Sequence, residues 1–265
     1  MYSVNYQRAS SVADAAQRAG SGDAKYLSGG MTLIPTMKSR LASPGVLVDL
    51  AHIPALKGIQ VSGGTVTIGA ATTHAEVATD AQLRKVAPSV SHLAGLIGDP
   101  HVRHRGTIGG SIANNDPAAD YPAAMLALDA TIVTDRRSIS AQDFFTGLFE
   151  TALEEGEMVT SVSFEAPEKA GYEKFRNPAS RYAMTGVFVV GGANAVRAAV
   201  TGAGDGGVFR SSEVEAALAK RFEPAALDGV TVPSASLMGD IHASPEYRAN
   251  LIVVMAKRAV AQANG

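Results

Sequence analysis

The sequence predicts an α+β protein, and three observations support this fold class. First, 46% of the 265 residues are hydrophobic and 18% are charged, as in a globular protein with a substantial core. Second, helix-like and strand-like segments follow each other without the regular strand–helix–strand alternation of a parallel α/β fold. Third, short apolar segments between residues 187 and 210 predict an antiparallel sheet in the last third of the chain.

The first 60 residues are predicted to form a small α/β unit. A helix is predicted over residues 12–19, because the hydroxyls of Ser10–Ser11 can cap its N-terminus and Gly20 can end it. A helix-like segment over residues 31–41 contains Pro35, which the first turn of a helix accommodates. The remaining segments of the unit are two strands and a connection, over residues 25–27, 46–50 and 53–59.

From about residue 60 the pattern changes. Residues 61–68 alternate apolar and polar side chains around Gly63–Gly64, which predicts a β-hairpin. The other segments predicted for this region are three helices and two strands, over residues 74–80, 86–97, 122–128, 130–134 and 158–164.

A linker over residues 167–171 is predicted to lead into a second, smaller domain. A capping box from Ser212 to Glu215 predicts a helix that runs to Arg221. Apolar residues at helical spacing predict a closing helix over residues 245–263. The strands predicted for the antiparallel sheet of this domain cover residues 187–190, 195–200 and 207–210.

Charge and cysteine content exclude several classes of protein. The chain has 23 Lys and Arg against 25 Asp and Glu, so no global field favours nucleic acid or an anionic membrane. Because it has no cysteine, it cannot hold a disulfide, an iron–sulfur cluster or a thiolate zinc site. The most apolar run, residues 182–200, is interrupted by glycines and Arg197, and the N-terminus lacks a signal peptide. We therefore expect a cytoplasmic protein without a membrane span.

Two glycine pairs are the strongest functional signal. Gly29-Gly30 and Gly109-Gly110 each follow an apolar segment and precede a hydroxyl side chain, Thr32 or Ser111. Glycine lets the backbone approach a bulky anion and turn its N–H groups toward it, so the pairs predict two opposing loops around one diphosphate. The alternative for each pair is an ordinary tight turn. Three residues downstream of the second pair could accept hydrogen bonds from ribose hydroxyls: Asn115, Asp116 and Asp120.

Other motifs favour structural interpretations. Residues 202–207 fit G-x-G-x-x-G, but extended residues follow them, which favours a hairpin turn over a dinucleotide site. His101 and His104 lack a third ligand at suitable spacing, so a polar loop is expected there and no metal site. Lys174 and Tyr182 fit either a surface strand or contacts to an electron-rich ring. The sequence has no G-x-S-x-G elbow, phosphate-binding P-loop or cysteine nucleophile. It therefore lacks the catalytic motifs expected of a hydrolase or a nucleoside triphosphatase.

Several segments resemble a known family, the FAD-binding medium subunits of molybdenum hydroxylases. This family includes aerobic carbon monoxide dehydrogenase and the flavin part of xanthine dehydrogenase, and the resemblance covers nearly the whole chain. The segments that carry it are 28–35 (SGGMTLIP), 49–50 (DL), 99–103 (DPHVR), 105–112 (RGTIGGSI), 115–120 (NDPAAD) and 240–248 (DIHASPEYR).

The resemblance implies a fold. Residues 1–168 would form a two-lobed FAD-binding domain of the PCMH (vanillyl-alcohol-oxidase-like) type, with lobes of about 1–57 and 58–168. Residues 172–265 would form a smaller α+β C-terminal domain of the carbon monoxide dehydrogenase flavoprotein type, with an antiparallel sheet and helices.

The resemblance also implies which residues bind FAD. Both glycine pairs would surround the diphosphate, the ribose carboxylate would be Asp120, and Lys174 and Tyr182 would lie beside the flavin ring, flanked by Met158 and Val159. It assigns a catalytic role to no side chain. The complete set of expected cofactor contacts is Ser28, Gly29, Gly30, Met31, Thr32, Leu33, Thr107, Ile108, Gly109, Gly110, Ser111, Asn115, Asp116, Asp120, Met158, Val159, Lys174 and Tyr182.

Two positions depart from the family pattern. Ser111 stands where the family usually has asparagine, so its shorter side chain would reach the phosphate through water. Arg181 stands where aspartate is common. The contacts around the flavin ring are therefore expected to differ in detail from those of the family.

By this resemblance the chain is one subunit of an oxidoreductase. A large molybdopterin subunit would oxidise the substrate, and a small subunit with [2Fe-2S] clusters would relay electrons to the FAD of this chain, as a dimer of heterotrimers. The FAD would deliver them to an acceptor, for which NAD, quinone, a ferredoxin-like protein and oxygen all stay open. One alternative is a free-standing FAD oxidase or reductase with the same fold. Another is a non-catalytic nucleotide-binding or assembly module.

Overall fold

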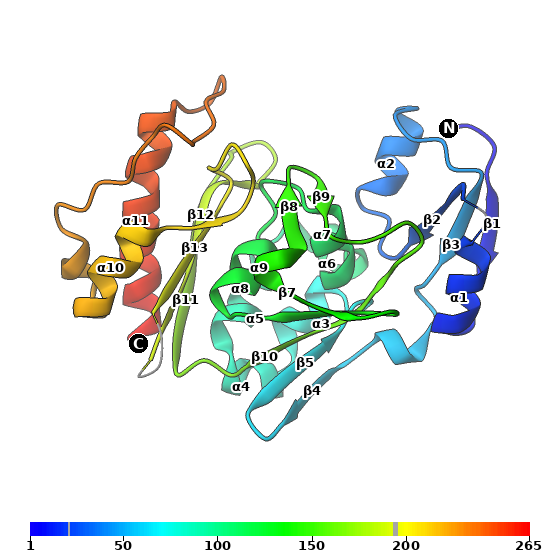
Figure 1. Cartoon of the computed structure of the whole chain (residues 1–265), viewed down its shortest axis with the longest axis horizontal. Coiled ribbons are helices and arrows are strands. Elements are labelled where there is room, and N and C mark those ends of the chain that lie inside the picture. The colour runs from blue at the N-terminus through cyan, green and yellow to red at the C-terminus, as the bar shows by residue number, and fades with distance from the viewer. Residues whose placement is uncertain (21, 193–195) are drawn as a thin grey trace.

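Three β-sheets of three to five strands lie side by side along the long axis of the protein, and a fourth sheet has two strands (Figure 1). The structure is a computed structural model that describes residues 1–20, 22–192 and 196–265. The N-terminal lobe lies at one end, a larger middle lobe follows, and the C-terminal sheet with its long helix lies at the other end. The mixed order of helices and antiparallel strands agrees with the predicted α+β class.

The N-terminal lobe contains a parallel three-stranded sheet in the order β1-β3-β2. Both predicted strands and the helix α1 are confirmed, and Ser11 caps α1 by accepting a 3.0 Å hydrogen bond from the Asp14 amide. The prediction did not include β1, which is mostly exposed and lacks an apolar run. The elements are β1 (Asn5–Arg8), α1 (Val12–Ala19), β2 (Ala24–Leu27), α2 (Leu33–Lys38), β3 (Val46–Asp49) and the short 3-10 helix η1 (Pro54–Leu56).

The middle lobe contains an antiparallel five-stranded sheet in the order β4-β5-β10-β6-β7. The predicted hairpin is its first pair of strands, and both turn residues, Gly63 and Gly64, have positive φ angles of 59° and 93°. The strands are β4 (Ile59–Ser62), β5 (Thr65–Gly69), β6 (Thr131–Thr134), β7 (Ser138–Ser140) and β10 (Val159–Glu165), with the separate pair β8 (Phe145–Gly147) and β9 (Glu150–Thr151).

The helices of the middle lobe correct two predictions. The helix predicted over 86–97 begins only at Pro88 and ends at Gly95, and a separate helix that was not predicted, residues 81–86, precedes it, because Pro88 lacks an amide hydrogen and begins a new helix. The histidines predicted in a polar loop lie in a helix that Asp99 caps by accepting from the Val102 amide at 2.9 Å. The helices are α3 (His74–Thr79), α4 (Ala81–Val86), α5 (Pro88–Gly95), α6 (Pro100–Arg105), α7 (Ile108–Asn114), α8 (Tyr121–Ala127) and α9 (Ala141–Phe144).

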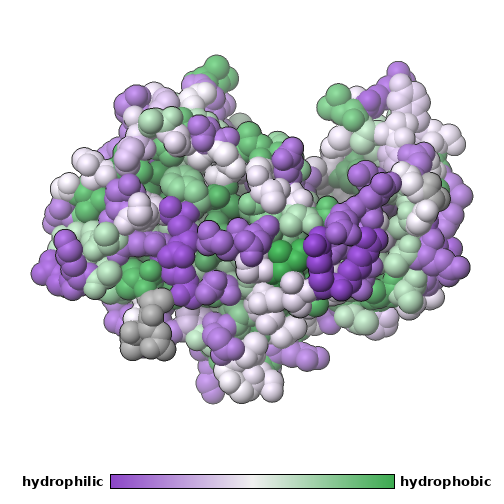
Figure 2. Space-filling view, in the orientation of Figure 1, coloured by the Kyte–Doolittle hydropathy of each residue, from purple (hydrophilic) through white to green (hydrophobic). Residues whose placement is uncertain are grey.

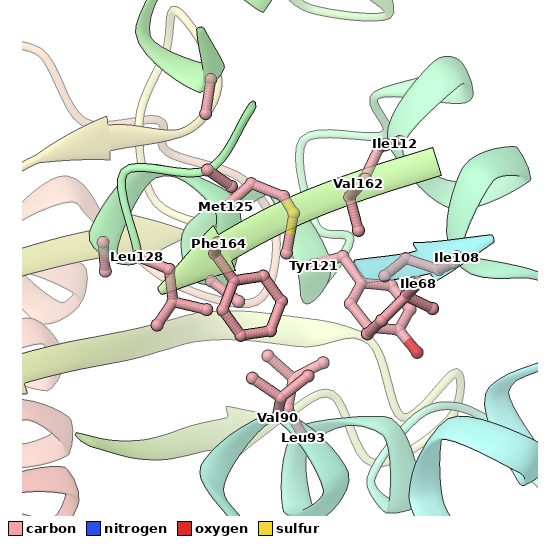
Figure 3. Close-up of a cluster of buried hydrophobic side chains, with 14 of the residues drawn as sticks. Ile68, Val90, Leu93, Ile108, Ile112, Tyr121, Met125, Leu128, Val162 and Phe164 are labelled. Carbon is pink, nitrogen blue, oxygen red and sulfur yellow. The ribbon is translucent and has the colours of Figure 1, made fainter. Parts of the chain in front are cut away.

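The largest hydrophobic core lies between the middle sheet and these helices. Figure 3 shows Phe164 and Val162 of β10 facing Leu93 of α5 and Met125 of α8. The same cluster includes Phe188 of the C-terminal sheet. Because this core extends across the predicted boundary at residues 168–172, the division into two domains stays a prediction.

The C-terminal part is an antiparallel sheet in the order β11-β12-β13-β14 with α11 packed against it. The predicted linker is shorter than expected, because β11 begins at Lys169. The closing helix is confirmed, and so is the sheet, although Ala195 of one predicted strand lies outside the described residues. The elements are β11 (Lys169–Arg176), β12 (Ala183–Gly191), β13 (Arg197–Thr201), β14 (Phe209–Arg210), α10 (Ser212–Lys220), η2 (Pro224–Leu227) and α11 (Pro245–Ala263).

Of the two motifs predicted in this region, the structure contradicts the capping box and agrees with the G-x-G-x-x-G turn. The predicted capping box is wrong, because Ser211 is the N-cap and its side chain makes no capping hydrogen bond. Glu215 instead accepts from the Ala198 amide at 2.9 Å and from Arg210 at 2.7 Å, which ties α10 to the sheet. The G-x-G-x-x-G motif is a connection between two antiparallel strands, as predicted.

In residues 1–20, 22–192 and 196–265, no helix combines the length and apolar character needed to cross a bilayer. Over the same ranges, no three His, Cys, Asp or Glu side chains are grouped closely enough to hold a metal ion.

Candidate cofactor site

A cavity of about 650 Å³ lies where the N-terminal lobe meets the middle lobe. Figure 2 shows the surface notched between the N-terminal lobe and the rest of the molecule. Its lining comes from all three parts of the chain, including the loop at 180–182 that precedes β12. A volume of this size is typical of a site for a drug-sized or larger ligand.

Most of the residues predicted to contact a cofactor line this one cavity. The two exceptions are Ile108, which is fully buried in the core, and Asn115. The lining residues from the predicted set are Ser28, Gly29, Gly30, Met31, Thr32, Leu33, Thr107, Gly109, Gly110, Ser111, Asp116, Asp120, Met158, Val159, Lys174 and Tyr182.

Asn115 supports a neighbouring hairpin and does not line the cavity. It ends α7 with a left-handed backbone, φ 42°, and is buried. Its side-chain amide donates to the carbonyl oxygens of Gly147 and Glu150, both at 2.8 Å, and its own carbonyl accepts from the Phe149 amide at 3.1 Å. Its polar groups therefore hold the β8–β9 hairpin against α7.

The first glycine loop, residues 28–33, offers free backbone donors to the cavity. Its six N–H groups donate to no acceptor in the part of the chain that the structure describes. Gly29 packs so closely that a Cβ there would overlap the carbonyl of Arg105, and Gly30 has a φ of 69°. Glycine is therefore required for the loop to lie here with its amides unpaired. This arrangement suits an anion such as a diphosphate.

The second glycine loop, residues 107–111, differs from the prediction of a second amide-lined loop. The amides of Ile108 and Gly109 donate to the carbonyl oxygens of Thr72 and Ala70, at 3.1 and 2.9 Å. The amide of Gly110 donates to Thr107 Oγ1 at 3.2 Å. These donors are already used within the protein, so the prediction is wrong for this loop.

What the second loop provides is space and hydroxyl groups. A Cβ on Gly110 would meet only Thr107 Oγ1 at 3.0 Å and Ser28 Cβ at 4.0 Å, so this position faces the cavity. Ser28 Oγ and Thr107 Oγ1 are hydrogen-bonded at 2.9 Å. The two glycine loops are thus joined directly, and Ser111 lies beside them in the cavity wall.

Asp120 and Lys174 form a buried ion pair in the cavity wall. Lys174 Nζ lies 2.8 Å from Asp120 Oδ1 and 3.0 Å from Oδ2, and the side chains are 1% and 4% exposed. The Tyr172 hydroxyl also donates to Oδ1, at 2.5 Å. Burial first, and then the nearby Asp120 charge, raises the pKa of Tyr172 well above its ordinary value. The carboxylate predicted to bind ribose therefore already has two protein partners.

Tyr182 and Asp116 both line the cavity. Burial, followed by the charges of Asp116 and Asp120, raises the pKa of the Tyr182 hydroxyl. Burial also raises the pKa of Asp116, although the Ala118 amide partly opposes this. Arg181 lies in the same wall with a positive φ of 64°.

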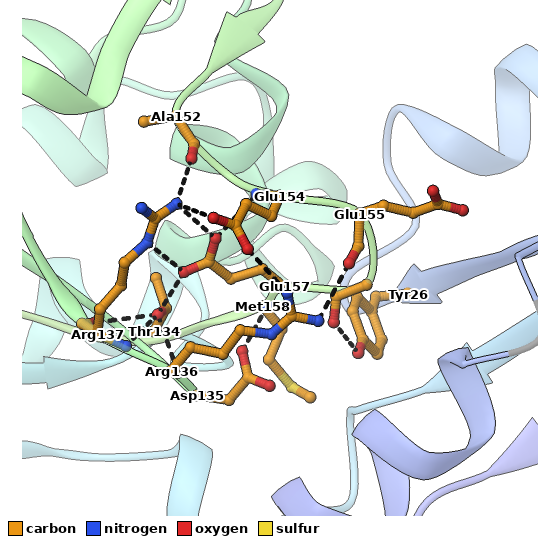
Figure 4. A network of polar contacts seen from close by, with 11 residues as sticks. Tyr26, Thr134, Asp135, Arg136, Arg137, Ala152, Glu154, Glu155, Glu157 and Met158 are labelled. Carbon is orange, nitrogen blue, oxygen red and sulfur yellow. Dashed lines mark hydrogen bonds and ion pairs between the residues drawn. The ribbon is translucent and has the colours of Figure 1, made fainter.

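The segment from Leu153 to Val159 forms another wall, held by an ion-pair network (Figure 4). Arg137 donates to both oxygens of the buried Glu157, each at 3.0 Å, and Thr134 donates to Oε1 at 2.7 Å. Tyr26 of the N-terminal lobe donates to the Gly156 carbonyl at 2.8 Å. The network thus fixes the segment that carries Met158 and links it to the other lobe.

We expect this network to make stability sensitive to acid. The Arg137 hydrogen bond, opposed by burial, lowers the pKa of Glu157 to about 2 from an ordinary 4.5. A carboxyl with a lowered folded-state pKa stabilises the fold above the unfolded pKa, and this contribution is lost as pH falls from about 4.5 to about 2. Glu157→Gln should therefore be less stable at pH 7 and lose less stability between pH 7 and pH 3, measured by urea unfolding.

The matched control is Glu165→Gln, on an exposed residue at the end of β10. This variant should lose as much stability on acidification as the parent chain. Equal losses in all three proteins would show that the Arg137–Glu157 pair does not carry the acid sensitivity.

His74 is a cavity residue that sequence reasoning missed. It begins α3 and is buried, and its backbone amide donates to the Gly106 carbonyl at 2.9 Å. Burial, and then the charge of Arg103, lowers its pKa to about 4. The sequence carries no signal for it, since a single histidine at a helix start is common on any protein surface.

Comparison with known proteins identifies the family. Residues 2–167 match the family model described as the FAD binding domain in molybdopterin dehydrogenase. The chain belongs to this family. The resemblance expected from the glycine loops is thereby confirmed.

Relatives and solved structures extend the similarity over nearly the whole chain. This FAD-binding chain is 35% identical over 284 residues to the carbon monoxide dehydrogenase medium chain of Afipia carboxidovorans, covering 98% of this chain and 96% of that one. It is 34% identical over 257 residues to the nicotine 6-hydroxylase medium subunit of Paenarthrobacter nicotinovorans, covering 91% and 90%.

A solved structure of carbon monoxide dehydrogenase from Hydrogenophaga pseudoflava superposes with a TM-score of 0.87 at 34% identity. The match covers 99% of this chain and 97% of that chain. The expected fold, a two-lobed FAD-binding unit followed by a smaller α+β part, is confirmed.

Proposed function

We propose that this chain is the FAD-binding subunit of a molybdenum-containing hydroxylase or dehydrogenase. It takes electrons from [2Fe-2S] clusters on a small partner subunit and passes them to an external acceptor, while a large molybdopterin subunit oxidises the substrate. The observation that carries this proposal is the cavity whose first glycine loop presents unpaired amides, in a fold shared with medium chains over nearly their full length. Because the chain has no cysteine, the clusters must lie on another chain.

The residues present fit FAD. The free amides of residues 28–33 and the hydroxyls of Ser28, Thr107 and Ser111 would hold the diphosphate, and the open position at Gly110 lets it approach. Met158, Val159, Lys174 and Tyr182 would surround the flavin ring, as the family pattern implies. Bound FAD supplies the redox chemistry, and the side chains of this chain bind it, orient it and exclude water.

The finer features of the assembly are part of the same proposal. We propose that the chain functions in the cytoplasm, in a dimer of heterotrimers. Residues 1–168 act as the FAD-binding domain and residues 172–265 as the C-terminal domain. The arrangement of three sheets around one cavity supports the division of roles along the chain.

The test is the composition of the complex purified from its native source. We expect two co-purifying chains, with molybdenum and iron in the complex and flavin absorbance that stays with this chain after the subunits are separated. A metal-free monomer that turns over an organic substrate would contradict the proposal and favour a free-standing FAD oxidase or reductase. A colourless chain without flavin would favour a non-catalytic assembly module.

A further inference from the structure

His74 has an unused hydrogen-bonding group at the cavity wall. The capping box of Thr73 and Glu76 fixes the start of α3, and the side chain of His74 packs 5.5 Å from the Tyr121 ring. His74 is only 5% exposed, and its ring nitrogen Nδ1 has no hydrogen-bond partner within residues 1–20, 22–192 and 196–265. Buried polar groups are nearly always paired, so an unpaired imidazole beside a cavity points to a bound ligand.

The charge state of His74 restricts what it can bind. Burial and the nearby Arg103 charge lower its pKa to about 4, so the ring is neutral at pH 7. A neutral imidazole offers one N–H donor and one acceptor. A diphosphate offers only acceptors, whereas the edge of an uncharged heterocycle offers both donors and acceptors, so a neutral imidazole suits the heterocycle in either tautomer.

The cavity that His74 lines also has apolar side chains in its wall. Leu56, Ile97 and Val102 line the same cavity from η1, the α5–α6 connection and α6. The cationic side chains of the lining lie on other elements, which are β2, β11 and the loop before β12. An apolar wall with one polar group is the usual environment for a flat aromatic ring.

The fit around His74 depends on Gly106. A Cβ at residue 106 would lie 2.6 Å from His74 Nε2 and 2.8 Å from Cδ2, so only glycine leaves room for the imidazole. The backbone hydrogen bond between the two residues fixes this contact. The ring nitrogen is therefore held in one place relative to the second glycine loop.

We propose that His74 hydrogen-bonds the adenine base of FAD and thereby makes the chain select FAD over FMN. This inference rests on the proposed placement of FAD, which assigns the flavin ring to Met158, Val159, Lys174 and Tyr182. The adenine is then the aromatic group left for the apolar wall of His74. One neutral ring nitrogen at a fixed position can donate to a ring nitrogen of a purine or accept from its amino group.

The test compares FAD with ADP, which carries its adenine half, and with FMN, which carries its flavin half. The full chain, stripped of flavin, is titrated with FAD, ADP and FMN by calorimetry. His74→Phe should weaken FAD and ADP by the same factor, about tenfold for one lost hydrogen bond, and leave FMN unchanged. His74→Gln, which keeps a donor and an acceptor, should stay within about threefold of the parent chain. His74→Leu repeats the measurement with a smaller side chain if the phenyl ring is not accommodated.

The control is His92→Phe, on a histidine of α5 that does not line the cavity and faces Glu173 at 3.8 Å. It should change none of the three affinities. Unchanged ADP affinity in His74→Phe, together with a shifted flavin reduction potential, would place His74 against the flavin and overturn the inference. If His74→Phe binds FAD and ADP normally but Gly110→Asp does not bind FAD, then His74 does not contact the adenine, although FAD still occupies the cavity. If both bind FAD normally, the proposed placement itself fails.

Discussion

Gly110→Asp is expected to abolish FAD binding without unfolding the protein. Gly110 is exposed at the third position of α7, and its missing side chain faces the cavity. An aspartate near the start of a helix is favourable for the helix itself. In the cavity, however, its carboxylate would lie against the diphosphate, and repulsion between like charges a few ångströms apart amounts to about 4 kcal/mol at a protein surface. We therefore expect FAD affinity to fall at least about 100-fold.

Two measurements separate binding from folding in this variant. Flavin fluorescence quenching gives the FAD affinity, and the melting temperature of the flavin-free chain should equal or exceed that of the parent. Gly206→Asp is the matched control, because a Cβ at Gly206 meets nothing within 4 Å and this glycine does not line the cavity. If Gly110→Asp kept its affinity, the diphosphate would have to bind elsewhere.

Lys174→Met is expected to destabilise the flavin-free protein by about 3–5 kcal/mol. The substitution leaves Asp120 buried and charged, with the Tyr172 hydroxyl as its one remaining partner in the part of the chain that the structure describes. An unpaired buried charge costs far more than a lost surface ion pair. The double variant Lys174→Met/Asp120→Asn removes that charge and should recover much of the loss. Urea unfolding of the three proteins measures both effects.

The control for this prediction lies on the same strand. Lys169 begins β11, is exposed, and donates to Asn264 Oδ1 at 2.9 Å. Lys169→Met should cost less than about 1 kcal/mol, because exposed contacts of this kind contribute little. If Lys174→Met lost no more free energy of unfolding than Lys169→Met, the buried Asp120–Lys174 pair would not stabilise the protein as its geometry implies.

Local signals predicted those elements whose ends are determined by neighbouring residues. The helix α11 was predicted with its observed bounds, since Ser244 accepts from the Tyr247 amide at 3.2 Å and Pro245 occupies the first turn. The β4–β5 hairpin depends in the same way on two adjacent glycines. The strand β1 was not predictable, because it is held by parallel pairing with β3, about 40 residues further along the chain.

Long-range contacts explain what the sequence did not predict at the site. The amides of the second glycine loop are paired with carbonyls of Ala70 and Thr72, which no local pattern links to residues 108–109. Asn115 looked available for a ligand, but the chain returns 32 to 35 residues later to use its amide. The residue types near the cofactor were predictable from the motif, whereas their hydrogen-bond partners depended on the folded structure.

Hydrogen bonds beside the cavity join the two lobes, and a ligand bound between them should add to the stability of their contact. The N-terminal lobe has its own sheet, and Tyr26–Gly156 and Ser28–Thr107 fasten it to the middle lobe beside the cavity. A ligand that binds to both lobes stabilises the contact between them. At a concentration 100 times its dissociation constant, such a ligand adds about 2.7 kcal/mol against separation of the lobes. Flavin supply would then govern how long a newly made chain survives proteolysis while it waits for assembly.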